Sequence, residues 1–421
     1  MKVLILNTFE TKGGAAVAGK RLAVALIKNG VQATLLVKEK KTSDKNVFTI
    51  ITSHLAKDTA YLSFVLERLQ IFINNRFNRK NLFAISTAST GMSIIRNKLV
   101  KEADIIHIHW INQGFLSLKS IEKLIATGKP IVWTMHDMWP VTGICHHSRE
   151  CDYYTKDCGN CFFLINPSKD DLSFRVFEKK KRIIKGADIQ FVACSEWLQK
   201  RSEISNLIEG NKITNIPNPI DTDHFLPGDK IAARTALNLP LDKKILLFGA
   251  LIASDKRKGI DYLIEVTHLL KDLKEEVELV FCGEIKEKLS SAFGLKSHSL
   301  GYVSNPELIV KMYQAADCFV IPSLEENLPN MIMEAMSCGI PCVGFKTGGI
   351  PEMIQHKKTG YLSEYKSAED FANGIRYVLE SSEEKKLSVT SREFVLANYS
   401  EESVSKRYIK IYNSLITNRK L

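Results

Sequence analysis

The chain has 421 residues, of which 45% are hydrophobic, and its formal net charge at pH 7 is +11. This length exceeds what one hydrophobic core supports, so we expect two or more domains. No apolar run reaches the ~18–20 residues that span a bilayer, which excludes a transmembrane helix, and Met1–Asn7 is typical of a first strand rather than of a signal peptide. We therefore expect a cytoplasmic protein.

Short apolar runs alternate with amphipathic helical segments, which predicts doubly wound parallel sheets of the α/β class. In the first half of the chain the predicted strands are Val3–Asn7, Ala33–Val37, Asp104–Ile108, Ile131–Met135 and Gln190–Cys194. The Pro- and Asn-rich segment Asn215–Asp221 predicts a hinge. Beyond it the predicted strands are Lys244–Gly249, Val277–Gly283, Asp317–Ile321 and Pro341–Phe345. We expect one domain over residues 1–215 and another over residues 216–399, followed by an amphipathic helix over Ser400–Ile416.

The first predicted strand is followed by a glycine turn that opens a helix. Its adjacent glycines, Gly13 and Gly14, allow backbone N–H groups to approach a phosphate or sugar closely. The turn lacks the Gly-x-Gly-x-x-Gly pattern of dinucleotide binding. Glycine pairs at such turns are also common for structural reasons, so this motif alone leaves both interpretations open.

Two further strands of the first half end in polar side chains. His107 and His109 close one strand, and His136 and Asp137 follow another. Because the carboxyl ends of parallel strands lie at one edge of a sheet, we expect these residues to lie near each other. A histidine at a strand end is often structural, so a ligand-binding role rests on further evidence.

Glu326 and Glu334 lie eight positions apart across a loop-to-helix junction. The loop follows a buried strand that ends at Ile321, and such loops bind anionic ligands in open α/β sheets because unpaired N–H groups and the helix dipole point there. Two alternatives remain: solvated surface charges, or the carboxylate pair of a glycoside hydrolase, which the spacing does not exclude.

A basic turn in the second half holds Arg257 and Lys258, directly before Gly259. Fixed cations here would stabilise the negative charge that builds on a departing diphosphate. Basic runs are otherwise solvated loops. Together with the predicted sheet edge, this turn favours group transfer over hydrolysis.

These motifs together resemble glycosyltransferase family 4, whose members are retaining enzymes of the GT-B fold, and the resemblance covers nearly the whole chain. It rests above all on the segment from Glu326 to Gly339, with two Glu residues and a helix ending in Cys-Gly, and on the His-Asp pair at His136. It implies two Rossmann-like domains facing a cleft, with a C-terminal helix, residues 400–421, that returns to the first. It also implies transfer of a hexosyl unit from a nucleoside-diphosphate sugar to a glycan or lipid-linked acceptor, without a catalytic metal, in the branch associated with polysaccharide and capsule assembly.

The resemblance also implies roles for individual residues. Glu334 would hold the donor ribose, and Glu326 would face the donor sugar. The residues implied to bind the donor are Gly13, Gly14, Arg257, Lys258, Val303, Glu326, Asn327, Leu328 and Glu334, and those implied in catalysis are His136, Glu326 and Lys258, with His136 positioning groups and stabilising charge. The chain departs from the family at Ala250, where an Arg is usual, so Arg257 would be a displaced substitute. It also departs at residues 327–329, which read Asn-Leu-Pro in place of Gly-Phe-Gly.

Four of the nine cysteines cluster between residues 145 and 161, at Cys145, Cys151, Cys158 and Cys161. Four thiolates at this spacing satisfy tetrahedral zinc, and the last pair has the common Cys-x-x-Cys spacing. Free thiols or a redox pair are the alternatives to a structural zinc. The other five cysteines lie in or beside apolar runs, which favours reduced, buried thiols over a disulfide framework.

The positive charge is concentrated near the N-terminus, since residues 1–100 hold 16 Lys and Arg against 5 Asp and Glu. Residues 61–80 predict an amphipathic helix with an apolar face formed by Phe64, Val65, Leu69, Phe72 and Ile73, and with basic residues Arg68, Arg76, Arg79 and Lys80. This helix could pack on the first domain or dock on an anionic membrane surface, and the concentrated positive charge favours docking, so we expect a peripheral enzyme on the inner face of the membrane. A nucleic-acid-binding protein would explain a pI near 9.0 but not the other motifs, so we expect no nucleic acid partner.

Overall fold

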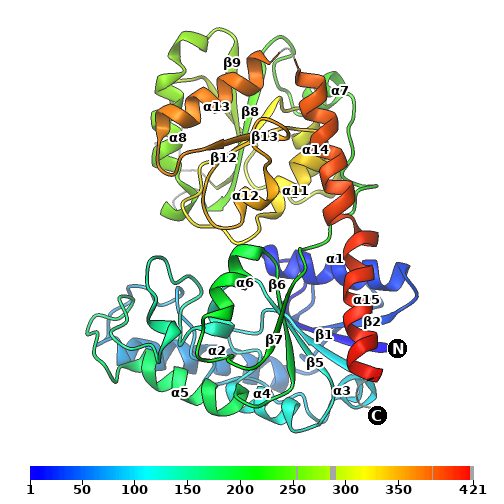
Figure 1. Cartoon of the computed structure of the whole chain (residues 1–421), viewed down its shortest axis with the longest axis vertical. Helices are drawn as coiled ribbons and strands as arrows, with labels where there is room; N and C mark the ends of the chain where they lie inside the picture. The colour runs from blue at the N-terminus through cyan, green and yellow to red at the C-terminus, as the bar shows by residue number, and fades with distance from the viewer. Residues whose placement is uncertain (253–254, 285–290, 382, 418–421) are drawn as a thin grey trace. The chain divides into compact units, whose positions relative to one another are not determined.

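A computed structural model describes residues 1–252, 255–284, 291–381 and 383–417 (Figure 1). It divides the chain into two compact units. The first comprises Met1–Pro219 and the chain from Val404 onward, and the second comprises Ile220–Ser403. The sequence had placed the corresponding boundaries at residues 215 and 399. Each unit contains one parallel sheet flanked by helices, which confirms the predicted pair of Rossmann-like α/β architectures.

The first unit is built on a parallel sheet with strand order β3-β2-β1-β4-β5-β6-β7. Its strands are β1 (Lys2–Phe9), β2 (Gln32–Glu39), β3 (Val47–Thr49), β4 (Ile105–Ile108), β5 (Ile131–Met135), β6 (Ile189–Ala193) and β7 (Lys212–Asn215). Its helices are α1 (Gly14–Lys28), α2 (His54–Asn74), α3 (Lys98–Glu102), α4 (Leu118–Ile125), α5 (Leu172–Ile184), α6 (Glu196–Glu203) and α15 (Glu401–Thr417), with short 3₁₀ turns η1 (Trp139–Val141) and η2 (Tyr153–Thr155).

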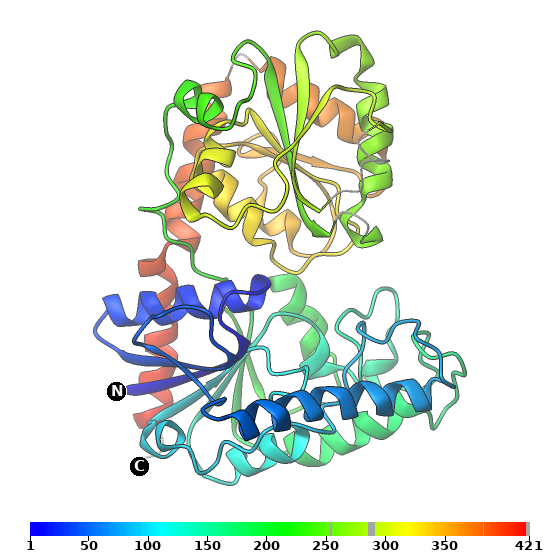
Figure 2. The ribbon, with the colours of Figure 1, turned by 180° about the vertical axis from the view of Figure 1, so that it is seen from behind.

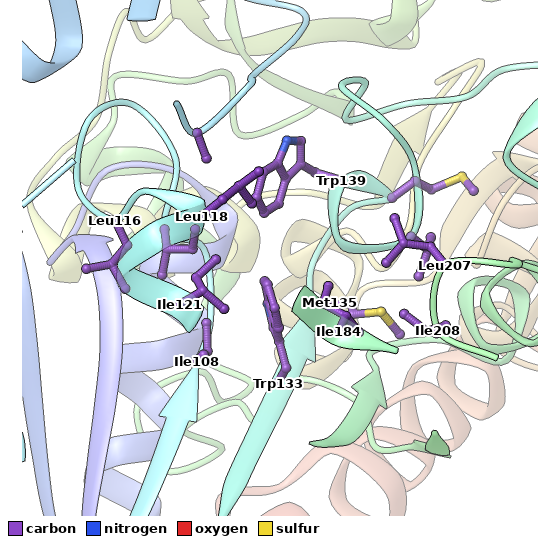
Figure 3. Close-up of a cluster of buried hydrophobic side chains, with 14 of the residues drawn as sticks. Ile108, Leu116, Leu118, Ile121, Trp133, Met135, Trp139, Ile184, Leu207 and Ile208 are labelled. Atoms are coloured by element: carbon purple, nitrogen blue, oxygen red, sulfur yellow. The ribbon is translucent and has the colours of Figure 1, made fainter. Parts of the chain in front are cut away.

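Apolar side chains alternate between the two faces of this sheet, as the two-residue period of a strand requires. On β1, Leu4 and Leu6 join a core that includes Ile71 of α2, and Figure 3 shows this core around Trp133. Val3 and Ile5 join a second core on the opposite face, beneath α1 and α15. Figure 1 shows α15, in red, running along the first unit.

The second unit is built on a parallel sheet with strand order β10-β9-β8-β11-β12-β13. Its strands are β8 (Lys244–Ile252), β9 (Val277–Glu284), β10 (Ser297–Ser299), β11 (Cys318–Ile321), β12 (Cys342–Phe345) and β13 (Gly360–Ser363). Its helices are α7 (Lys230–Ala236), α8 (Ile260–Leu269), α10 (Pro306–Gln314), α11 (Asn330–Ser337), α12 (Ile350–Met353), α13 (Ala368–Glu380) and α14 (Glu384–Tyr399), with 3₁₀ turns η3 (Lys256–Lys258) and η4 (Lys271–Leu273). Strands β8 and β11 pack their apolar side chains under α8 and α13.

Helix α2 faces the core with a side other than the predicted apolar face. The buried positions are Ala60, Ser63, Glu67, Arg68 and Ile71, whereas three of the five predicted face residues, Phe64, Val65 and Phe72, are half-buried. The inward side is polar because the Glu67 carboxylate accepts hydrogen bonds from the Ser86 hydroxyl and from the backbone N–H groups of Thr87 and Ala88. Figure 2 shows α2 as a long blue helix across the front of the first unit.

The opposite side of α2 carries an exposed apolar stripe, which we call the α2 stripe. It consists of Leu55, Leu62, Leu66, Leu69 and Ile73. Their spacing of seven, four, three and four residues places them on one helical face. Among the described residues, no helix combines the length and apolarity needed to cross a membrane.

Candidate active site

Three polar segments meet at the carboxyl edge of the second sheet, where β8, β11 and β12 are neighbours. The turn η3 lies beyond β8, the loop of residues 322–329 follows β11, and the turn of residues 346–349 follows β12. Backbone hydrogen bonds link them, because the Leu324 N–H donates to the Arg257 carbonyl at 2.7 Å and the Gly349 N–H donates to the Glu326 carbonyl at 3.2 Å. The predicted cation turn and the predicted carboxylate loop are therefore one connected structure.

Two glycines make this close approach possible. Gly259 has a φ of +69°, and a Cβ atom there would lie 1.8 Å from the Pro322 carbonyl oxygen. Gly348 has a φ of +56°, and a Cβ atom there would lie 1.7 Å from the Glu326 carbonyl oxygen. A side chain at either position would force the loop of residues 322–329 to move.

Lys258 and Glu326 form a direct ion pair at this edge, between Nζ and Oε1. The Ser323 hydroxyl donates a hydrogen bond to the same Glu326 oxygen at 3.1 Å. Both charged side chains remain partly accessible to solvent. The structure thus brings together the residues that the sequence assigned to the diphosphate and to the sugar of a donor.

Arg257 has a carboxylate partner within the same turn. Its Nη2 and Nε lie 2.6 and 3.2 Å from the two oxygens of Asp255, a fork that fixes the guanidinium. Burial raises the pKa of Asp255, but Arg257 and Lys258 together lower it by more, so the net pKa lies below its usual value. Arg257 is thus paired within its own turn, whereas Lys258 is paired with Glu326, the residue predicted to contact the donor sugar.

Glu334 lies in the first turns of α11 and is 9% exposed. The Tyr313 hydroxyl, from α10, donates a hydrogen bond to Glu334 Oε2 at 2.7 Å. Burial, and then the Glu334 charge, raise the pKa of Tyr313 well above its usual value, so the phenol stays protonated and remains a donor. The carboxylate is thereby held in one orientation.

The remaining predicted donor contacts of the second unit lie nearby in the fold. The backbone N–H of Val303 bonds to the sulfur of Cys282, near the end of β9, and Gly283 N–H donates to the Gly301 carbonyl at 2.8 Å. Asn327 is half-buried and Leu328 is buried, in the loop that holds Glu326.

At the carboxyl edge of the first sheet, β1, β4 and β5 are neighbours. Gly13 and Gly14 follow β1 and are exposed at the start of α1, while His109 follows β4 and His136 follows β5. His109 Nδ1 and His136 Nε2 lie 2.8 Å apart and share one hydrogen bond. The other nitrogen of His136, Nδ1, lies 3.5 Å from the sulfur of Cys194. Both ring nitrogens of His136 are therefore engaged by groups of its own unit.

These histidines are neutral at pH 7. Burial lowers the pKa of His136 to about 4, of His107 to about 3 and of His109 well below its usual value. The ring of His136 accordingly carries no positive charge to offer a ligand, which leaves positioning as the part of its predicted role that fits. His107 is structural, since Nδ1 contacts the Tyr412 hydroxyl and Nε2 contacts the Thr134 hydroxyl, each at 2.7 Å.

Asp137 holds the start of the following loop. One of its oxygens accepts hydrogen bonds from Trp110 Nε1 at 2.9 Å and from His146 Nδ1 at 2.7 Å, and the other accepts from the Trp139 N–H at 2.9 Å. Burial raises its pKa, but His146, the Trp139 N–H and His147 together outweigh that effect, and the net pKa is lowered to about 2. Asp137 thus acts as a structural anion that orients neighbouring aromatic rings.

The four clustered cysteines lie in the segment between β5 and α5. All nine cysteines of the chain are free thiols, and Cys145, Cys151, Cys158 and Cys161 line one cavity. Burial raises the pKa of Cys145, Cys158 and Cys161 to about 12. In the described part of the chain, no three His, Cys, Asp or Glu residues are already arranged as a set of metal ligands, so zinc binding stays a prediction.

Several groups that shape the two sites were not predicted. They are Tyr313, Ser323, Asp255 and Cys194. Tyr313 resembles an ordinary apolar helix position in the sequence, and its contact with Glu334 spans two helices. Of these four residues, Ser323 could have been predicted from the sequence, because a hydroxyl directly after a buried strand commonly faces the site that forms there.

The sequence matches established protein families along most of its length. A family model described as Glycosyltransferase Family 4 matches residues 12–224, and one described as Glycosyl transferases group 1 matches residues 229–393. The chain is 23% identical over 436 residues to the "Putative colanic acid biosynthesis glycosyl transferase WcaC" of Escherichia coli, which covers 99% of this chain and 100% of that one. It is 25% identical over 338 residues to the "D-inositol 3-phosphate glycosyltransferase" of Corynebacterium jeikeium, covering 74% of this chain and 72% of that one.

Solved structures share the fold. A sucrose-phosphate synthase from Thermosynechococcus elongatus superposes with a TM-score of 0.68 at 17% identity, over 99% of this chain and 100% of that one. The Anabaena protein Alr3699/HepE, solved in complex with UDP and glucose, superposes with a TM-score of 0.65 at 16% identity, over 98% of this chain and 100% of that one. These likenesses confirm the predicted GT-B fold.

Proposed function

Because the chain belongs to glycosyltransferase family 4, we propose that it transfers a hexosyl unit from a nucleoside-diphosphate sugar to an acceptor hydroxyl, with retention of anomeric configuration. The observation that carries this proposal is the ion pair between Lys258 and Glu326, beside the buried Glu334 at the same sheet edge. Family membership favours transfer over hydrolysis and over nucleic-acid binding, the two alternatives that the sequence had left open.

In this proposal the cation turn stabilises the leaving group. Negative charge builds on the diphosphate as the glycosidic bond breaks, and a fixed ammonium at Lys258 lowers the energy of that charge. Arg257 adds less, because Asp255 already neutralises much of its charge. Once Lys258 turns to the diphosphate, Glu326 is released to contact the donor sugar, together with the backbone of Asn327 and Leu328.

The other residues bind and orient. Glu334, fixed by Tyr313, accepts hydrogen bonds from the ribose hydroxyls, and the backbone near Val303 contacts the base. His136, neutral and held by His109, positions the reacting groups rather than supplying charge. Gly13 and Gly14 expose backbone N–H groups at the first sheet edge. No catalytic metal is required, since the chain's own cations balance the leaving group.

A thermal-shift panel tests the donor. A ligand that binds the folded state raises the melting temperature, so UDP-, GDP- and ADP-sugars are compared at equal concentration. UDP-sugars are tested first, because the Anabaena protein of the same fold was solved with UDP and glucose. A shift with one nucleotide class that disappears in Glu334→Ala supports the proposal. Identical shifts in Glu334→Ala and wild type would remove Glu334 from the donor site.

The acceptor we propose is a glycan or a lipid-linked glycan of polysaccharide assembly. The full-length similarity to a protein named for colanic acid biosynthesis supports this choice. A second support is the α2 stripe, whose exposed leucines would enter the interfacial region of a membrane while Arg76, Arg79 and Lys80, all exposed, contact anionic headgroups. We therefore propose a peripheral enzyme docked on an anionic membrane through α2.

Vesicle co-sedimentation tests the docking. Binding should require anionic lipid, weaken with salt, and fall in two variants: the apolar variant with Leu62, Leu66 and Leu69 changed to Ser, and the charge variant with Arg76, Arg79 and Lys80 changed to Glu. The matched control reverses the same number of charges at Lys28, Lys406 and Lys410, which lie on α1 and α15 against the other face of the sheet. Equal binding to neutral and anionic vesicles, or equal loss in the control, would contradict docking through α2.

A further inference from the structure

The segment between β5 and α5 is irregular apart from two short 3₁₀ turns, and it lines a small cavity. The cavity has a volume of about 20 Å³, which is room for about one water-sized occupant. Its lining includes Cys145, Cys151, Cys158 and Cys161. Cysteines spread over seventeen positions of an irregular loop are thus brought to one cavity.

Backbone donors already face two of the sulfurs. The Gly143 N–H donates to the Cys158 sulfur at 3.3 Å, and the N–H of Phe163 bonds to the Cys161 sulfur, two residues earlier in the chain. Such N–H groups stabilise a sulfur that carries negative charge, and they orient it as outer-sphere contacts do in metal sites. A neutral thiol gains much less from them.

A buried cation lies beside the same cysteines. Lys180 of α5 is 0% exposed, and its Nζ donates to the carbonyls of Trp139 at 2.6 Å and Thr142 at 2.9 Å. Burial lowers the pKa of Lys180 to about 7, and the nearby Cys145, Cys158 and Asp137 oppose that shift. Within the described ranges, no carboxylate forms a salt bridge with Lys180. A buried ammonium without an ion-pair partner is costly, so a negative centre at the cavity would stabilise it.

We propose that Cys145, Cys151, Cys158 and Cys161 bind one structural Zn²⁺ in this cavity. Four thiolates and one Zn²⁺ carry a net charge of −2, which supplies the missing countercharge for Lys180. Binding releases four protons from the thiols and needs side-chain rotation, since the cysteines are not yet in a ligating arrangement. The donor set is the one that zinc prefers in closed, structural sites.

The metal would fasten this segment to the rest of the first unit. The Ile165 N–H donates to Asn75 Oδ1 at 2.7 Å, and the Asn81 amide donates to the Phe163 carbonyl at 3.0 Å, so the segment packs on the end of α2. Asp171 holds its other end, accepting from the Cys161 N–H and the Ser173 N–H, each at 2.8 Å. Zinc therefore has a structural role, distinct from the chemistry proposed for the second unit.

The test is the zinc content of the full chain, purified reduced from zinc-supplemented cells without chelator. We expect about one equivalent of zinc by elemental analysis, and its loss in each single Cys→Ser variant at the four positions. The matched control is Cys318→Ala, a buried cysteine of β11 in the second unit, which should retain the metal. Zinc binding of the wild type should also raise the melting temperature of the first unit.

If the serine variants fail to fold, the wild-type chain still decides the matter. Reduced, metal-free chain is titrated with Zn²⁺ while free thiols are counted, and four thiols per chain should become protected as about one ion binds. Four reactive thiols at saturating Zn²⁺, a disulfide among the four cysteines in the native protein, or equal zinc loss in Cys318→Ala would each overturn the proposal.

Discussion

Tyr313 and Glu334, on two different helices, form a hydrogen bond inside the second unit, with the phenol donating to the carboxylate at 2.7 Å. A buried carboxylate held by a neutral donor is fixed in direction, which suits the role proposed for Glu334, accepting hydrogen bonds from the ribose hydroxyls. If Glu334 binds the donor as proposed, the pair connects stability and donor binding, and a conservative substitution of Tyr313 should affect both.

Tyr313→Phe removes the hydroxyl and keeps the ring. Since hydrogen bonds to charged groups contribute ~1.5–3 kcal/mol, we expect the free energy of unfolding to fall by about 2 kcal/mol and nucleotide affinity to weaken. Chemical denaturation and calorimetric titration with the best nucleotide measure both effects. In a double-mutant cycle with Glu334→Gln the two losses should not add. Full additivity would mean that the hydroxyl and the carboxylate act separately.

Lys258→Ala should lower kcat/KM by ~10²–10³-fold, because in the proposed mechanism the Lys258 ammonium is a fixed positive charge that stabilises the departing diphosphate. Lys258→Arg should restore little, since a planar fork does not replace a compact ammonium at the same place. The control is Lys256→Ala, an exposed lysine of the same turn. Initial rates with the identified donor measure the change, and similar losses at Lys256 and Lys258 would point to general charge rather than to a fixed contact.

Gly348→Ala tests the close packing around Glu326. The left-handed backbone alone costs ~1–2 kcal/mol for a residue with a Cβ atom, and the Glu326 carbonyl oxygen blocks the added methyl group. We expect lower stability together with weaker donor binding. Gly210→Ala is the control, because Gly210 has a φ of +83° and open space around it. It should lose stability without losing affinity, and equal affinity losses would contradict the role of the close contact.

Acidification should destabilise the first unit before carboxylates titrate. Histidines in the unfolded chain titrate near pH ~6.5, whereas the pKa values of His107 and His136 in the folded chain are about 3 and about 4. Their contribution is therefore fully present above pH ~6.5, and it falls with decreasing pH by up to ~1.4 kcal/mol per pH unit and histidine, because the unfolded chain binds the extra protons.

Tryptophan fluorescence reads this effect from the first unit alone, because all four tryptophans, Trp110, Trp133, Trp139 and Trp197, belong to it. Denaturation midpoints measured between pH 8 and pH 5 should decrease toward low pH. His107→Gln should flatten the slope, since a neutral amide can still bond to Tyr412 and Thr134. A slope unchanged by this substitution would exclude His107 as a source of the dependence.

The proposed glycosyl transfer should continue at the same rate after brief exposure of the enzyme to EDTA. The cations proposed to act on the diphosphate are side chains, so initial rates with EDTA and with added Mg²⁺ should agree. Short incubation separates this effect from any slow unfolding caused by loss of structural zinc. A rate that collapses at once in EDTA and returns with Mg²⁺ alone would show a catalytic metal.

The interior strands were predictable from sequence and the sheet edges were not. Buried parallel strands such as β5 and β11 are continuous apolar runs with a turn at each end. The edge strands β7 and β10 are short and polar, with the sequences Lys-Ile-Thr-Asn and Ser-His-Ser, and nothing in their composition distinguishes them from loops. Their strand character depends on pairing with a neighbour that the sequence does not identify.

The candidate site was likewise predictable only in part. Positions carried by motif spacing, such as Glu334 and Lys258, could be assigned to one sheet edge from the sequence. Contacts between distant segments could not, and the direct pairing of Lys258 with Glu326 is one of them. The sequence left open whether the apolar face of α2 packs on the domain or stays exposed. Hydrophobicity rules place Glu67 and Arg68 in solvent, whereas both are buried and hydrogen-bond to the segment after α2.

Because α15 lies near the C-terminal end of the chain, it affects when the first unit can finish folding. Tyr412 contacts His107, and Tyr408 contacts the Thr134 hydroxyl at 2.9 Å, so this helix covers one face of the first sheet. A ribosome releases residues 220–403 before residues 404–417. The half of the chain that emerges first is thus the half that finishes folding last, and the part of its sheet that α15 covers stays exposed throughout synthesis of the second unit, with α1 the only other described helix on that face.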